Sequence, residues 1–344
     1  MADHLGPFEL GRVHNPDCLA AMRQLPDGCI DAVVTDPPYF RVKREAWDRQ
    51  WADAGKFLDW IGQLAEQWAR TLKANGSLYV FASPEMASRV ECKIGERFNV
   101  LNRIRWLKDA GWHKKAKKET LRSYLSPWEE IIFAEQRSDE YADAETRLHQ
   151  RVYAPIGRAV LAKREAARLR RWEIDVACAP SQKPTGLCYR WEEGACLPTE
   201  EQWVALCRRC GDGREHEDLR REHEDLRRPF AASADAPYTD VWTFAPVSAH
   251  PGKHPCEKPV ALLEHIIRVS TRPGAVVLDG FCGSGSTRVA AEGLGRRFLG
   301  FEIDPHWCQV ANDRIAAAAR GLTVSDLRRG QGQLFAPPAA GGSK

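Results

Sequence analysis

The stretch AVVLDGFCGSGSTRVA, residues 275–290, decides the fold of this chain. Its apolar start at 275–278 predicts a buried strand, and the spacing of apolar residues over 287–294 predicts a helix. The glycines between them allow a sharp turn and a close approach of the backbone to a ligand. Glu302 lies at the end of the next predicted strand, 297–303. An acid there commonly accepts hydrogen bonds from ribose hydroxyls, so the stretch predicts a site for a nucleotide-type cofactor.

Strands and helices alternate outward from this stretch in both directions. Further strands are predicted at 9–14, 30–35, 77–82, 102–107 and 130–134, and further helices at 57–72, 259–270 and 305–319. Such alternation predicts an α/β fold with an open, mostly parallel sheet and helices on both faces. The glycine-rich turn alone does not choose among NAD, FAD and S-adenosylmethionine, and a turn without a ligand is the alternative.

Composition and charge limit the class of protein. The chain has 344 residues, of which 43% are hydrophobic and 28% charged, as in globular proteins with a buried core. It has no run of 18 apolar residues and no apolar N-terminal segment, so we expect no membrane span, no secretory signal and a cytoplasmic location. Eleven cysteines in such a protein are expected to be reduced. With a net charge of +3, a nucleic-acid partner would need local basic patches, such as 112–122 and 151–171, although a solvated helix face is the alternative.

A proline-rich turn, Asp36-Pro37-Pro38-Tyr39, ends the predicted strand 30–35. Two prolines cannot continue a central strand, and ligands bind where parallel strands end. A carboxylate, the Pro37 carbonyl and an aromatic ring suit a planar base that carries an amino group, because the oxygens accept from the amino hydrogens and the ring stacks on the base. Taken alone, the tetrapeptide is equally compatible with a turn that has no chemical role.

Together the two motifs resemble those of the DNA methyltransferases that modify exocyclic amino nitrogens. In that family [D/N/S]-P-P-[Y/F] is the catalytic motif, and the form with Asp and Tyr is typical of N6-adenine enzymes. The sequence at 279–285 is similar to the cofactor motif D-P-F-x-G-S-G, with Gly280 in place of the usual proline. The segment HPCEKP at 254–259 resembles the family's H-P-x-x-K-P. Because the catalytic motif comes first, the order resembles the β group, a circular permutation of the Rossmann-like class I methyltransferase sheet.

The resemblance implies a role for each matching residue. The catalytic residues would be Asp36, Pro37, Pro38 and Tyr39. The cofactor, S-adenosylmethionine, would be held by Asp17, His254, Lys258, Pro259, Asp279, Phe281, Gly283, Ser284, Gly285, Ser286, Glu302 and Asp304. The expected parts are a catalytic half at 1–136, a mainly helical target-recognition insert at 137–238, a cofactor-binding half at 239–320 and a flexible tail at 321–344.

The activity implied by the resemblance is site-specific methylation of adenine N6 in double-stranded DNA. The target base would leave the duplex, because its amino group is otherwise paired. It would stack on Tyr39, while Asp36 and the Pro37 carbonyl accept its amino hydrogens. The alternatives are methylation of cytosine N4, an inactive DNA-binding regulator on the same scaffold, and an RNA or small-molecule methyltransferase.

The insert offers further hypotheses. Its predicted helices, at 156–165, 169–178, 185–191 and 201–206, are similar in order to the helix-turn-helix modules of repressor-like proteins, with 185–190 entering the major groove. A generic helical insert is the alternative. The tandem repeat REHEDLR at 214–227 predicts a highly charged helix. Cys207 and Cys210 have the spacing of zinc ligands, but a second close pair is missing, so we expect no metal.

Two partners follow from resemblance alone. Relatives in the β group are often dimers, which implies a homodimer. The peptide at 331–335, QGQLF, is similar to the Q-x-x-L-F peptides that dock on bacterial sliding clamps, and a disordered tail without a partner is the alternative.

Overall fold

A computed structural model describes residues 3–42, 45–108, 122, 124–137, 157–179, 183–210, 216–231, 239–248 and 253–318. The chain divides into two compact units, which we call the sheet unit (1–135 and 229–344) and the helical unit (136–228). The chain therefore leaves the sheet unit at 135 and returns to it at 229, so that residues before and after the insert build one sheet.

The sheet unit contains an eight-stranded sheet in the order β3-β10-β9-β4-β5-β7-β6-β8. Its strands are β3 (Arg12–His14), β4 (Ile30–Thr35), β5 (Leu72–Ala82), β6 (Phe98–Leu107), β7 (Trp128–Gln136), β8 (Val241–Thr243), β9 (Val276–Asp279) and β10 (Arg297–Phe301). The first five strands in this order, β3, β10, β9, β4 and β5, are parallel, and β7 runs antiparallel to β5. A separate antiparallel pair consists of β1 (His4–Leu5) and β2 (Phe8–Glu9). The α/β class with a mostly parallel sheet is confirmed.

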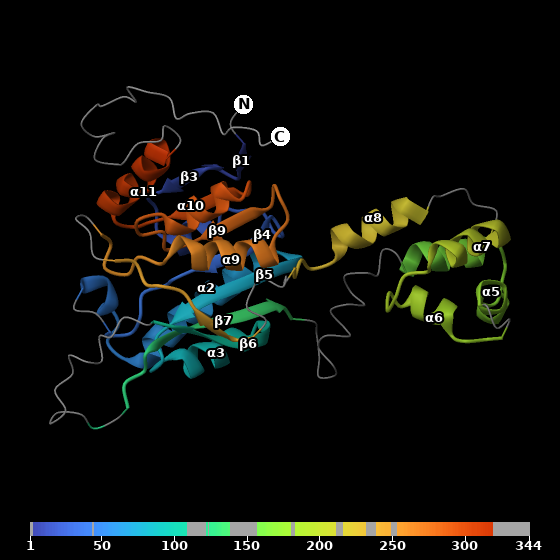
Figure 1. Ribbon diagram of the computed structural model, residues 1–344, viewed down its shortest axis with the longest axis horizontal. Helices are drawn as coiled ribbons and strands as arrows, with labels where there is room; N and C mark the ends of the chain where they lie inside the picture. Colours follow the sequence, from blue (N-terminus) through green and yellow to red (C-terminus); the bar gives the residue numbers. More distant parts are fainter. Residues whose placement is uncertain are drawn as a thin grey trace, which may run out of the picture. The chain divides into compact units, whose positions relative to one another are not determined.

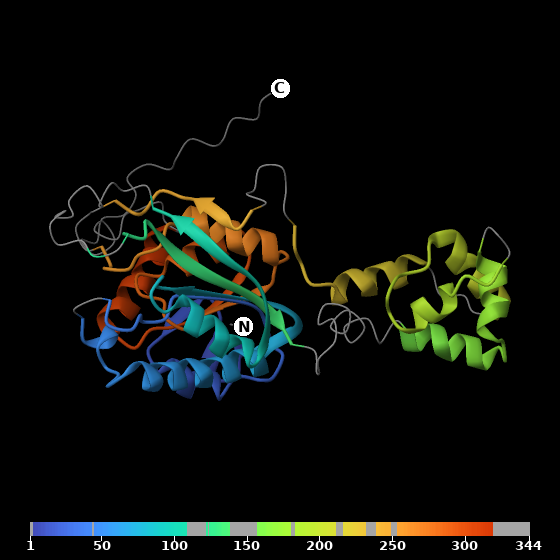
Figure 2. The ribbon, with the colours of Figure 1, turned by 90° about the horizontal axis from the view of Figure 1, so that it is seen from below.

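Helices cover both faces of this sheet (Figures 1 and 2). They are α1 (Cys18–Met22), α2 (Ala54–Thr71), α3 (Ala87–Gly95), α9 (Val260–Ser270), α10 (Ser286–Gly293) and α11 (Pro305–Ala318), with a short 3-10 helix at Ala46–Asp48. Successive strand residues point to opposite faces. Val33 and Leu78 accordingly pack with α1, α2 and α3, whereas Val34 and Tyr79 pack with α9 and α10. Both faces of the central strands are buried, which explains their continuous apolar runs.

Two strand boundaries differ from the sequence-based expectations. The strand expected at 9–14 is interrupted, because Gly11 has a positive φ of 75° that an extended strand cannot contain. The strand expected at 77–82 begins earlier, at Leu72, so that Asn75 and Gly76 lie inside β5. The pairing of β4 with β5 shifts register between Ile30 and Ala32, so β5 accommodates these residues as an irregularity.

The helical unit contains a helix at 157–166 followed by α5 (Arg171–Cys178), α6 (Leu187–Glu192), α7 (Glu200–Cys210) and α8 (His216–Leu226). Its core includes Val160, Ile174, Trp191 and Trp203. The short helices expected from the sequence are present, and His216–Leu226 of the REHEDLR repeat form the charged helix α8, in which ion pairs join residues three apart. Among the described residues, no helix combines the length and apolarity needed to cross a membrane.

Asp175 organises the turn that precedes α6. Its carboxylate accepts hydrogen bonds from the backbone amides of Thr185 (3.2 Å), Gly186 (2.8 Å) and Cys188 (2.8 Å). A buried carboxylate that accepts several amide hydrogens fixes a turn strongly. α6 thereby starts at a defined place with Tyr189 half exposed.

Candidate active site

A cavity of about 470 Å³ opens where the carboxyl ends of β4, β9 and β10 meet. This volume lies in the range of small-molecule sites. The parallel pairing of β4 with β9, with Val33 opposite Leu278, brings the residues after each strand to the same edge. Every residue proposed above for catalysis or cofactor binding lines this cavity except Pro259 and Gly285. The two motifs are therefore neighbours in space.

The glycine-rich turn is held by the acid at the end of β10. Glu302 accepts a 2.7 Å hydrogen bond from the amide of Gly283 through Oε2 and a 2.9 Å bond from the amide of Asp304 through Oε1. Burial raises the pKa of Glu302. A Cβ on Gly283 would lie 3.0 Å from the imidazole of His254, so glycine is needed for the ring to approach the turn. Glu302 and the HPCEKP segment thus shape the turn from two sides.

Asp279 connects the turn to the catalytic strand. Its carboxylate accepts hydrogen bonds from the hydroxyls of Thr35 (2.8 Å) and Thr287 (2.6 Å) and from the amide of Phe281 (3.0 Å). Burial raises the pKa of Asp279 to about 6, although these hydrogen bonds oppose the shift. The residue directly before Asp36 is therefore fixed to the first residue of the glycine-rich motif.

Pro259 and Gly285 lie outside the cavity and have structural positions instead. Gly285 has φ = +81° at the start of α10, and a Cβ there would lie 2.9 Å from the Cβ of Ala311. Glycine therefore allows α10 to begin and α11 to pack closely against it. Pro259 occupies the N-cap position of α9.

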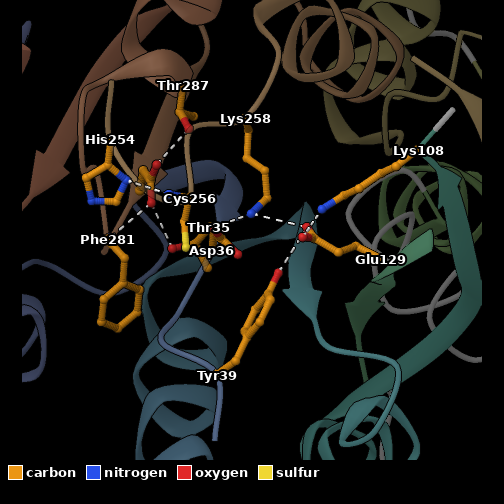
Figure 3. Close-up of polar contacts among 11 residues, drawn as sticks. Thr35, Asp36, Tyr39, Lys108, Glu129, His254, Cys256, Lys258, Phe281 and Thr287 are labelled. Atoms are coloured by element: carbon orange, nitrogen blue, oxygen red, sulfur yellow. Dashed lines mark hydrogen bonds and ion pairs between the residues drawn. The ribbon is translucent and has the colours of Figure 1, made fainter. Parts of the chain in front are cut away.

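The Asp-Pro-Pro-Tyr turn lies in a network of buried charges (Figure 3). Lys258 pairs with Oδ2 of Asp36, and its ammonium is also 3.3 Å from Oε2 of Glu129. The hydroxyl of Tyr39 donates a 3.3 Å hydrogen bond to that same Glu129 oxygen, and Lys108 pairs with Oε1 of Glu129. Oδ1 of Asp36 is inaccessible to solvent and has no hydrogen-bond partner among the described residues.

The network sets the protonation of its members. Burial raises the pKa of Asp36, while Lys258 opposes that shift. Burial also acts to raise the pKa of Glu129, but Lys258 and Lys108 outweigh it and lower the pKa. Burial acts to lower the pKa of Lys258, but the two carboxylates outweigh it and raise the pKa. Lys258 thus favours the ionised form of both carboxyl groups, although burial still holds the pKa of Asp36 above its ordinary value.

Several residues at the site were not predicted from the sequence. Trp60 from α2 contacts Phe281 edge-on with ring centroids 5.5 Å apart, and Trp307 contacts His254 at 4.6 Å. Ile303, beside Glu302, lines the cavity and is 66% exposed. A large apolar side chain with this exposure can cover the face of a purine. The position of Ile303 directly after Glu302 was the feature of the sequence from which its place at the cavity could have been predicted.

The residues present suit S-adenosylmethionine. Glu302 would offer carboxylate oxygens to ribose hydroxyls, Ile303 would offer an apolar surface to the adenine, and the turn at 279–285 would let the ligand approach the backbone. Among the described residues, no three His, Cys, Asp or Glu side chains are grouped to hold a metal ion.

Comparison with curated proteins places these features in a family. The sequence profile of the DNA methylase family matches residues 30–313. The DNA adenine methyltransferase YhdJ of Escherichia coli (strain K12) is 26% identical over 311 residues, covering 88% of this chain and 82% of YhdJ. The type II methyltransferase M.BamHI of Bacillus amyloliquefaciens is 24% identical over 310 residues, covering 89% of this chain and 57% of M.BamHI.

Solved structures share the fold. A DNA modification methylase of Thermus thermophilus, TTHA0409, superposes with a TM-score of 0.50 at 19% identity, covering 89% of this chain and 94% of its own. The cytosine-N4-specific PvuII DNA methyltransferase gives 0.51 at 14% identity, covering 87% and 84%. These likenesses confirm the Rossmann-like class I methyltransferase sheet. Since the family profile spans most of the sheet unit on both sides of the insert, the chain belongs to the DNA methylase family, whose members methylate amino nitrogens of DNA bases.

Proposed function

We propose that this DNA amino-methyltransferase methylates N6 of adenine at a specific sequence in double-stranded DNA. The observation that carries the proposal is the shared cavity, in which Asp36 and Tyr39 face the glycine-rich turn. The Asp form of the tetrapeptide and the similarity to an enzyme named as an adenine methyltransferase support adenine over cytosine.

The methyl donor is S-adenosylmethionine, which supplies a methyl group already activated by the sulfonium. We assign Glu302 to its ribose hydroxyls and Asp17 to the amino group of its adenine. The glycine-rich turn at 279–285 lets the cofactor come close to the backbone. Asp279 acts through Thr35 and Thr287 by holding the turn in place. Pro259 and Gly285 contribute through the backbone geometry of α9 and α10.

The base side of the cavity belongs to the tetrapeptide. A base amino nitrogen is a poor nucleophile because its lone pair is delocalised into the ring. Asp36 and the Pro37 carbonyl accept its two hydrogens, which favours a tetrahedral nitrogen as positive charge develops. Tyr39 stacks on the flipped base, and Pro38 keeps the turn rigid. An ionised Asp36 favours the transfer, because a carboxylate accepts the amino hydrogen more strongly than a protonated carboxyl does and stabilises the developing positive charge.

The helical unit reads the DNA sequence in this proposal. Asp175 fixes the start of α6, where Tyr189 and Arg190 are exposed on one short helix. Arg171 lies 5.3 Å from the centroid of the Tyr189 ring, and its ion pair with Glu192 at 2.6 Å fixes the guanidinium beside that ring. A defined helix with exposed aromatic and basic side chains suits contacts in the major groove.

Three further assignments are proposals. The homodimer and the docking of residues 331–335 on a sliding clamp come from resemblance, and the cytoplasmic location comes from the sequence features described above. Residues 112–121 of the first basic stretch, residues 151–156 of the second and the tail at 321–344 lie outside the described residues. A pull-down of a sliding clamp with and without residues 328–344 tests the docking.

Methyl transfer from labelled S-adenosylmethionine to unmethylated genomic DNA tests the main proposal. After digestion to nucleosides, we expect N6-methyldeoxyadenosine by mass and retention time. N4-methyldeoxycytidine would replace the proposal by the cytosine alternative, and absence of label would support the inactive regulator. Modification-sensitive sequencing of the treated DNA then gives the recognition sequence.

A further inference from the structure

Lys258 belongs to a motif that the sequence assigned to cofactor binding, yet its ammonium lies on the base side of the cavity. It pairs with Oδ2 of Asp36 and is 3.3 Å from Glu129. It also lies 5.6 Å from the centroid of the Tyr39 ring and 5.1 Å from that of Phe81. A donor on Asp36 above the face of Tyr39 is the arrangement expected for the amino group of the target base.

Glu129 offers Lys258 a second carboxylate. Oε2 of Glu129 also accepts from the Tyr39 hydroxyl at 3.3 Å, and Oε1 is paired with Lys108. Lys258 is 8% exposed and Glu129 is 17% exposed, so neither charge is well solvated. A buried ammonium that leaves one carboxylate must keep another within reach, because an unpaired buried charge is costly.

We propose that Lys258 is a positioning residue for methyl transfer: it keeps Asp36 ionised and occupies Oδ2, one of the two acceptor oxygens of Asp36, until the target amino group displaces it toward Glu129. This inference rests on the assignment of Asp36 as the amino acceptor. Glu129, which belongs to none of the motifs, is the receiving carboxylate. Both residues act through Asp36 and Tyr39.

The charges around Asp36 give the sign of each effect. The groups that face it are Tyr39 from its own turn, Lys258 and Cys256 from the segment before α9, Glu129 from β7 and Asp279 from β9, with Lys108 behind Glu129. Burial favours the protonated carboxyl, Lys258 favours the carboxylate, and Glu129 favours the protonated form. Removing the cation or the anion therefore shifts the titration in opposite directions.

The test is the pH profile of single-turnover methyl transfer to unmethylated genomic DNA. In Lys258→Met the acid limb should move up by about 1 to 3 pH units, the size of a carboxylate shift caused by a neighbouring cation. Lys258→Arg should restore the wild-type limb. Lys253→Met is the matched control, because Lys253 donates to the Val247 carbonyl, and it should leave the limb unchanged.

Glu129→Gln should move the acid limb of the pH profile to lower pH, because it removes the anion that favours the protonated form of Asp36. It should also raise KM for DNA, because Lys258 then lacks the second carboxylate toward which the amino group displaces it. Opposite shifts from two neutralising substitutions at paired residues cannot come from a general loss of packing. An unchanged limb in Lys258→Met, or a loss of S-adenosylmethionine affinity as its sole effect, would overturn the proposal. So would an unchanged KM in Glu129→Gln.

A second measurement separates this inference from the proposed function. The carboxyl carbon-13 signal of Asp36, assigned with Asp36→Asn, reports its titration without turnover. A wild-type protein that methylates cytosine or nothing would refute the proposed function, while the shift of this signal in Lys258→Met would still decide whether Lys258 holds Asp36 ionised. Absence of that shift overturns the inference.

Discussion

The hydroxyl of Thr35 donates a 2.8 Å hydrogen bond to Oδ1 of Asp279, although 244 positions separate the two residues. The same hydroxyl oxygen accepts from the amide of Gly280 at 3.2 Å. Thr35 ends the strand before the catalytic turn, and Asp279 begins the glycine-rich turn. One side chain therefore sets the spacing between the two halves of the site.

We expect Thr35→Val to lose both bonds and leave part of the Asp279 carboxylate unsatisfied. Hydrogen bonds to charged groups contribute about 1.5 to 3 kcal/mol, so the free energy of unfolding should fall by that amount in urea titrations. Thr239→Val, at an exposed position on the same unit, is the control. An equal effect of the two substitutions would contradict the special position of Thr35.

Asp36→Ala should abolish methyl transfer while leaving cofactor binding measurable. The loss in turnover should be at least about 10²-fold, the usual effect of removing a group that stabilises transition-state charge. Calorimetric titration with S-adenosylmethionine and labelled transfer measure the two properties separately. Asp27→Asn, whose carboxylate is 80% exposed, should change neither. Parallel loss of binding and transfer in Asp36→Ala would refute the assigned role.

Gly285→Ala should destabilise the protein more than Gly28→Ala does. Both glycines have a positive φ, which costs a residue with a side chain about 1 to 2 kcal/mol. A Cβ at Gly285 would also lie 2.9 Å from Ala311, whereas nothing lies within 4 Å of a Cβ at Gly28. The difference between the two variants in thermal or urea unfolding measures the cost of separating α10 from α11. No difference would mean that the helices move apart freely.

Stability should depend on pH through His254. Burial lowers the pKa of His254 from 6.5 to about 4. Between these values the unfolded chain binds a proton that the folded protein excludes, so this residue makes the free energy of unfolding rise as pH increases from about 4 to 6.5. His254→Asn should remove this contribution, which is at most about 3 kcal/mol.

Urea unfolding of wild type and His254→Asn at pH 5 and pH 7.5 measures how much His254 contributes to the change in the free energy of unfolding between these pH values. Asp279 acts with the opposite sign, because its raised pKa makes stability fall as pH rises from 3.8 to about 6. The comparison of variants, and not the wild-type curve alone, therefore isolates His254. His306→Asn, at an exposed position, is the control. If the free energy of unfolding rose more between pH 5 and pH 7.5 in His254→Asn than in wild type, the sign would be contradicted.

Asp175→Ala should loosen the turn before α6 and weaken DNA binding without affecting the binding of S-adenosylmethionine. It removes the acceptor of three backbone hydrogen bonds, and we expect faster amide hydrogen exchange at Gly186 and Cys188. Gel-shift titration on unmethylated genomic fragments measures DNA affinity. Glu200→Gln, exposed on α7, is the control. Unchanged DNA affinity after the turn has loosened would argue against recognition by α6.

Local patterns in the sequence were sufficient for the sheet and for the proximity of the two motifs. Asp36 and Asp279 each follow a short apolar run, and the carboxyl ends of neighbouring parallel strands share an edge. Glu129 could not be predicted in this way, because it lies at the beginning of a strand. It reaches the same edge since β7 runs antiparallel to β5, with Ala82 opposite Glu130, and this pairing depends on long-range packing.

Lys258 shows a second limit of the sequence. Its motif was sufficient to place it at the cavity, but which neighbour it faces depends on the side-chain directions of α9 and β7. Gly11 shows a third limit, because the sequence of a predicted strand does not reveal whether the φ of a single glycine in it is positive. The assigned roles of the cavity residues stay predictions until they are measured.

The strand order has a consequence for synthesis of the chain. β3 and β4 are made first, yet β10 and β9 lie between them, and both come from the last quarter of the sequence. Until the ribosome has passed Phe301, β9 and β10 are missing from the nascent sheet, and the edges of β3 and β4 that will pair with them are unpaired. Completion of the sheet must therefore follow translation of nearly the whole chain, and contacts so distant in sequence close slowly. A product truncated before β9 would present unpaired edges suited to aggregation.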